Sequence, residues 1–157
     1  MSTPDEAVGS RRHVQPIARI ALIATYAILC LAATGRSAYQ ISTKLSEAPV
    51  PYLLSAVSAL LYGVIAYAMY KGMRRLAIVG SAIELVGVLT VGALGYLESS
   101  WWPDETVWTG FGSAYGWVPL LLPIAALIAL ARAKASTTAA PEPASGGPEV
   151  TRADDGD

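Results

Sequence analysis

The residue best placed for chemistry is Glu84, an acidic side chain inside the apolar run LAIVGSAIELVGVLTVGALGYL. A charged group at the centre of a membrane helix costs at least ~2.5 kcal/mol on insertion scales unless protein or water surrounds it. Counting along the apolar runs from one side of the membrane at 1.5 Å per residue places Tyr26 and Tyr62 at the depth of Glu84. We therefore expect one intramembrane polar cluster, with a hydrogen bond between Glu84 and a tyrosine hydroxyl.

Three interpretations of this cluster are open. The carboxyl group can be a neutral, structural hydrogen-bonding group, it can bind a proton or cation for transport, or it can bind a small ligand. Gly80, Gly87 and Gly95 lie on the same helical face as Glu84, and small residues allow membrane helices to approach closely. This pattern favours the structural interpretation and predicts that the face meets the helix that carries Tyr62.

A second group of polar and aromatic residues lies in the segment ESSWWPDETVWTGFGSAYGW, which carries Asp104 and Glu105. Its tryptophans are Trp101, Trp102, Trp108 and Trp117. Tryptophans at membrane boundaries normally lie among the lipid headgroups. The alternative is an outer lid over a lipid or apolar ligand, for which the local glycines supply backbone freedom. Arg36 is expected near Asp104 and Glu105, either as a salt bridge or as part of an anion-binding pocket.

The chain offers little else for catalysis. It contains one cysteine, Cys30, and one histidine, His13, so Cys–His pairs, disulfides and histidine clusters for metal or haem are not predicted. We expect no enzyme activity, no catalytic residues, no metal, no cofactor and no nucleic-acid partner.

The elements that must position these residues are apolar helices. Hydrophobic residues make up 54% of the chain and charged residues only 15%, which is too apolar for an ordinary soluble domain. Four runs approach the ~20 residues that cross a bilayer, and they lack the alternation of barrel strands. The sequence therefore predicts an all-α, four-transmembrane-helix bundle. Its helices are expected at about 17–34, 51–70, 76–97 and 117–131, with outer loops at 35–50 and 98–116.

The positions of lysine and arginine predict the orientation, because these residues are enriched in cytoplasmic loops. One side of the membrane receives Arg11, Arg12, Arg19, Lys71, Arg74, Arg75, Arg132 and Lys134. The other side receives Arg36 and Lys44. Both termini and the short connection KGMRR are therefore expected in the cytoplasm.

The two ends of the chain are poor in core-forming residues. We expect residues 1–14 to form a disordered N-terminal tail, residues 15–134 the transmembrane domain, and residues 135–157 a disordered C-terminal tail rich in Ala, Pro, Gly and acidic residues. A solvating role for the C-terminal tail is favoured over partner binding.

Three segments carry a resemblance to a known group of proteins: GRSAYQISTKLSEAPVPYLLSAVSALLYGV, IELVGVLTVG and DETVWTGFGSAYGWVPLLLP. The chain resembles small actinobacterial four-helix conserved integral membrane proteins of uncharacterised function. The resemblance implies a multi-pass protein of the bacterial plasma membrane and brings no catalytic residues. We expect a non-enzymatic accessory or assembly component of a larger envelope or respiratory membrane complex. Its partners would be the lipid bilayer and other membrane protein subunits or further copies of itself. The alternative is a small proton- or cation-coupled transporter that uses Glu84.

Overall fold

The computed structural model describes residues 4–97 and 104–138, and this part of the chain is helical without strands. Its elements are α1 (Pro4–Lys44), α2 (Pro49–Lys71), α3 (Arg74–Leu97), the 3-10 helix η2 (Thr109–Tyr115) and α4 (Val118–Thr138). The helical fold predicted from the apolar runs is confirmed for these residues. Three helical segments are long and apolar enough to cross a membrane, Pro16–Lys44, Pro49–Lys71 and Arg74–Leu97.

The helix α1 is longer at both ends than the predicted span of 17–34. It begins at Pro4, within the segment expected to be a disordered tail, because proline is tolerated in a first helical turn and no further proline follows before Pro16. It continues to Lys44, through most of the expected outer loop 35–50, since that stretch lacks proline until Pro49. The ammonium of Lys44 lies 3.8 Å from the Glu47 carboxylate in the following turn.

The connection between α2 and α3 is a tight helical hairpin. Gly72 adopts the left-handed conformation (φ 70°), and the N–H of Met73 donates to the carbonyl oxygen of Ala68. This is the hydrogen-bond pattern of a glycine-capped helix end, which glycine forms without steric penalty. The connection KGMRR therefore joins α2 and α3 in an antiparallel hairpin, and we call this side of the molecule the hairpin end.

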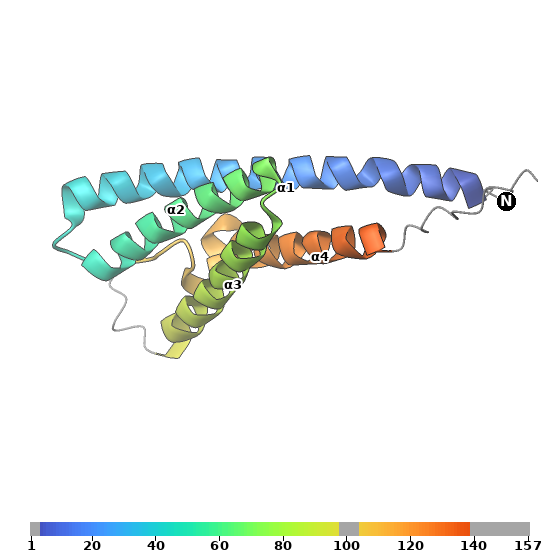
Figure 1. The fold of residues 1–157 in the computed structure, drawn as a ribbon. Coiled ribbons are helices and arrows are strands. Elements are labelled where there is room, and N and C mark those ends of the chain that lie inside the picture. Colours follow the sequence, from blue (N-terminus) through green and yellow to red (C-terminus); the bar gives the residue numbers. More distant parts are fainter. Residues whose placement is uncertain (1–3, 98–103, 139–157) are drawn as a thin grey trace, which may run out of the picture.

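The helices do not form a simple four-helix bundle. Figure 1 shows α1 and α2 side by side, whereas α3 diverges from α2 with distance from the hairpin. The segment from Asp104 to Tyr115, which we call the inserted segment, lies between α2 and α3 (Figure 1). Its residues Thr106, Val107 and Trp108 are buried. The backbone then turns by 97° between η2 and the Val118–Ala133 portion of α4.

The glycine face of α3 therefore meets two different partners. A Cβ atom at Gly80 would lie 2.7 Å from Ile65 of α2, as expected for a contact between the two helices. Further along, a Cβ atom at Gly87 would lie 2.8 Å from the Trp108 ring, and Gly95 faces Thr109. The prediction that the whole face meets α2 is wrong, because the inserted segment separates the helices beyond the hairpin end.

Candidate functional site

The candidate site is a buried polar cluster in the middle of the bundle. The hydroxyl group of Tyr26 on α1 donates a hydrogen bond to Glu84 Oε2 on α3 at 2.8 Å. Ser81, one turn from Glu84, has its Oγ 3.5 Å from the same hydroxyl oxygen. All three side chains are completely shielded from solvent. The structure thus brings Tyr26 and Glu84, placed at one depth by sequence counting, into direct contact.

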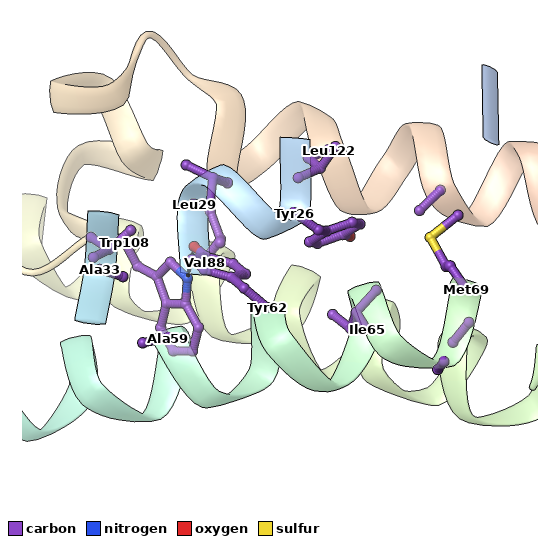
Figure 2. Packing of buried hydrophobic residues seen from close by; sticks show 14 of the residues in the cluster. Tyr26, Leu29, Ala33, Ala59, Tyr62, Ile65, Met69, Val88, Trp108 and Leu122 are labelled. Atoms are coloured by element: carbon purple, nitrogen blue, oxygen red, sulfur yellow. Dashed lines mark hydrogen bonds between the residues drawn. The ribbon is translucent and has the colours of Figure 1, made fainter. Parts of the chain in front are cut away.

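Tyr62 of α2 joins the cluster through its ring and not through the carboxyl group. The Tyr62 and Tyr26 ring centroids lie 6.2 Å apart, with the rings tilted by 46°. The Tyr62 hydroxyl accepts a hydrogen bond of 3.0 Å from the indole Nε1 of Trp108. Figure 2 shows these aromatic side chains in one group between the helices.

The most informative atom of the site is Glu84 Oε1. It is buried and has no hydrogen-bond partner. An ionised carboxyl group would leave this oxygen uncompensated, and a hydroxyl on Oε1 would be a donor without an acceptor. A buried polar atom without a partner costs about 1–3 kcal/mol. The cluster is therefore chemically incomplete at this one position.

Trp108 does not lie in a headgroup belt, the first of the two positions that the sequence leaves open. Its side chain is only 5% exposed and lies in the core against Gly87. The indole is large and apolar with a single N–H donor, and both properties are satisfied by the packing and the Tyr62 hydroxyl. In the sequence, the uncharged, glycine-rich stretch GFGSAYG just after Trp108 is the feature that indicates entry of this segment between the helices. Trp117, by contrast, is 45% exposed.

The second predicted cluster, Arg36 with Asp104 and Glu105, is held by hydrogen bonds and not by a salt bridge. Arg36 Nη2 donates to the backbone carbonyl oxygen of Glu105 at 2.7 Å and does not pair with either carboxylate. Asp104 Oδ2 accepts hydrogen bonds from the Tyr52 hydroxyl at 2.9 Å and from Gln40 Nε2 at 3.3 Å. The sequence could not indicate this partner of Arg36, because every residue carries a backbone carbonyl group. Trp101 and Trp102 lie outside the described residues.

The electrostatics of Asp104 favour its charged form. Partial burial pushes the pKa upward, but three influences outweigh it: the Tyr52 hydrogen bond, the backbone N–H of Glu105, and the nearby charges of Arg36 and Lys44. The pKa of Asp104 therefore lies below its usual value of 3.8. Hydrogen bonds of Asp104 and Arg36 together fasten the inserted segment to α1 and α2 on the side away from the hairpin end.

Two grooves lie beside the cluster. The first, of about 430 Å³, is at the hairpin end and is bounded by α1, the hairpin and α4; Arg19, Leu22, Ala77 and Leu130 are among its lining residues. The second, of about 600 Å³, lies mainly between α1 and α2. The small residues Cys30, Ala56, Ala59 and Gly63 line it together with larger ones that include Leu60, Tyr67 and Leu76. Among the residues that the structure describes, no group of three His, Cys, Asp or Glu side chains could hold a metal ion in either groove.

Comparison with known protein families, with curated proteins and with solved structures finds no match to this chain. The resemblance to actinobacterial membrane proteins remains a prediction.

Proposed function

We propose that this chain is a non-enzymatic, four-pass protein of the bacterial plasma membrane that assembles with another membrane protein. Three crossings would be α1, α2 and α3. The fourth would combine the inserted segment with α4, whose backbone from Val118 to Leu130 spans only ~18 Å of the ~30 Å hydrocarbon core. Non-helical backbone is tolerated at that depth where protein surrounds it, and Thr106, Val107 and Trp108 are buried.

The proposed orientation, with both termini in the cytoplasm, is supported by how basic residues gather at the hairpin end. Arg19 of α1 donates to the carbonyl oxygens of Met69 and Tyr70, at 2.6 Å and 3.2 Å. Arg74 donates to the carbonyl oxygen of Leu130 on α4 at 3.1 Å. Contacts among all four helices thus bring basic side chains together at one end, and such an end is normally cytoplasmic.

The groove between α1 and α2 is the observation that carries the assembly proposal. Its lining runs over residues 30–37 of α1 and 56–67 of α2, and the small side chains among them would let another helix approach closely. The hydroxyl-bearing Thr34 and Ser37 also line it and offer polar contacts inside the membrane. Its proposed occupant is a transmembrane helix of a different membrane protein.

Purification in mild detergent, followed by mass spectrometry of the co-migrating proteins, tests this assignment. We expect a membrane protein partner with the wild-type chain and its loss with Ala56→Phe, which fills the groove. The control is Val86→Phe on α3, which is 63% exposed and lies away from the groove. Recovery of a homodimer, of bound lipid alone, or of the same partner with Ala56→Phe would contradict the proposal.

A further inference from the structure

The buried Oε1 atom of Glu84 has no hydrogen-bond partner, so one oxygen of this carboxyl group is free to bind a small ligand. The polar groups around the carboxyl are few. Tyr26 from α1 is hydrogen-bonded to it, Ser81 from α3 and Tyr62 from α2 lie beside Tyr26, and Trp108 from the inserted segment is hydrogen-bonded to Tyr62. The helix α4 contributes the apolar Leu122 and Ala126 to the same core. Within the described residues, none of these groups supplies a positive charge to the carboxyl.

Access to the cluster differs between its two sides. On the outer side, the Trp108 ring lies against Gly87 and is hydrogen-bonded to Tyr62, so the inserted segment covers the site. On the hairpin side, the first groove reaches Leu22 and Ala77, which lie four residues before Tyr26 and Ser81 on their helices. That separation is about one helical turn, or ~6 Å along each axis.

The lining of this groove discriminates between possible ligands. Arg19 and Arg74 both contribute to it, and their positive charges disfavour entry of a metal cation. The cluster also offers few oxygen ligands, whereas Ca²⁺ and Mg²⁺ typically take six or more. A proton needs only one carboxylate oxygen and can arrive through water molecules in the groove.

We propose that Glu84, positioned by Tyr26 and Ser81, is a proton-binding site that exchanges with water through the hairpin-end groove and is sealed on the outer side by Trp108. A proton from groove water binds the carboxylate to give the neutral acid, and the reverse step returns it to water. This assignment is independent of the partner helix proposed for the other groove.

Carbodiimide labelling of the full-length protein in sealed membrane vesicles tests the proposal, since carbodiimides react with protonated carboxyl groups. A lipid-soluble carbodiimide should modify Glu84 in the wild type, with the adduct located by mass spectrometry and falling as the internal and external pH are raised together. Glu84→Gln should lose that adduct. The control Glu105→Gln removes an exposed carboxyl outside the cluster and should keep it. Labelling at Glu84 that does not change with pH would overturn proton exchange.

Sidedness is tested with the same lipid-soluble carbodiimide while the pH is raised on one side of the vesicle membrane only. We expect labelling of Glu84 to fall when the pH is raised at the hairpin end alone in the wild type, and when it is raised on either side in Trp108→Ala. Trp108→Phe retains an apolar ring but removes the N–H donor to Tyr62, so it supplies a second variant if Trp108→Ala does not fold. An equal fall in labelling of the wild type when the pH is raised on either side would refute the seal. Protection of Glu84 from labelling by Na⁺ or K⁺ at constant pH would overturn the proposal, because it would show that the site binds a metal cation.

Discussion

At the residue scale, Gly87 leaves no room for a side chain beside Trp108. A methyl group there would approach the ring to 2.8 Å, so we expect Gly87→Ala to lower the free energy of unfolding by about 1–3 kcal/mol through overpacking. On the same helix, a Cβ atom at Gly95 would meet Thr109 at 3.7 Å, an ordinary contact. Unfolding in detergent micelles should show a clearly smaller loss for Gly95→Ala. Equal losses would argue against the buried position of Trp108.

The hydrogen bond from Tyr26 to Glu84 makes a second prediction at this scale. Tyr26→Phe leaves the carboxyl group with neither oxygen paired, and a buried polar group without a partner costs about 1–3 kcal/mol. Tyr39→Phe, at a position that is 61% exposed, is the matched control and should change the free energy of unfolding by less than about 0.5 kcal/mol. The hydrogen bond is contradicted if both variants unfold alike.

At the scale of elements, the inserted segment is fastened to α1 and α2 through Asp104, and this contact should depend on pH. Because the pKa of Asp104 is lowered in the folded protein, its contribution to stability is present above the unfolded pKa near 3.8 and is lost as pH falls through the lower folded value. The melting temperature of the wild type should therefore fall in this acidic range. Asp104→Asn should unfold more easily at neutral pH and lack this part of the acid response.

The comparison for that profile is Glu105→Gln, which removes a neighbouring exposed carboxyl but leaves the Tyr52 and Gln40 hydrogen bonds to Asp104 in place. We expect its pH profile to follow the wild type. An Asp104→Asn profile that runs parallel to the wild type throughout would show that Asp104 does not fasten the segment.

The elements also show which features a sequence can predict. The helices α2 and α3 follow from their apolar length and from the short KGMRR connection, and the shared depth of Tyr26 and Glu84 follows from the helical rise. The position of Trp108 does not follow, because tryptophan suits both a headgroup belt and a buried site with one acceptor. The left-handed backbone at Gly110, Phe111 and Gly112, which folds the segment inward, depends on contacts across the chain. One is the Phe111 ring against Gly92.

At the scale of the whole molecule, the proposed topology contains a fourth crossing made of two unlike parts. The inserted segment would enter from outside and α4 would leave toward the cytoplasm, with the bend of 97° between their helical portions. An alternative with three crossings would leave Asp104 and the C-terminal end of α4 on the same side of the membrane.

Single-cysteine labelling in intact cells tests whether this fourth crossing exists. In a Cys30→Ala background, a membrane-impermeant maleimide would be applied to four variants, each with one new cysteine: Ser46→Cys, Met73→Cys, Glu105→Cys and Ser136→Cys. The account predicts labelling from outside for Ser46→Cys and Glu105→Cys, and labelling of Met73→Cys and Ser136→Cys only after the cells are opened. Labelling of Glu105→Cys and Ser136→Cys from the same side would contradict the fourth crossing.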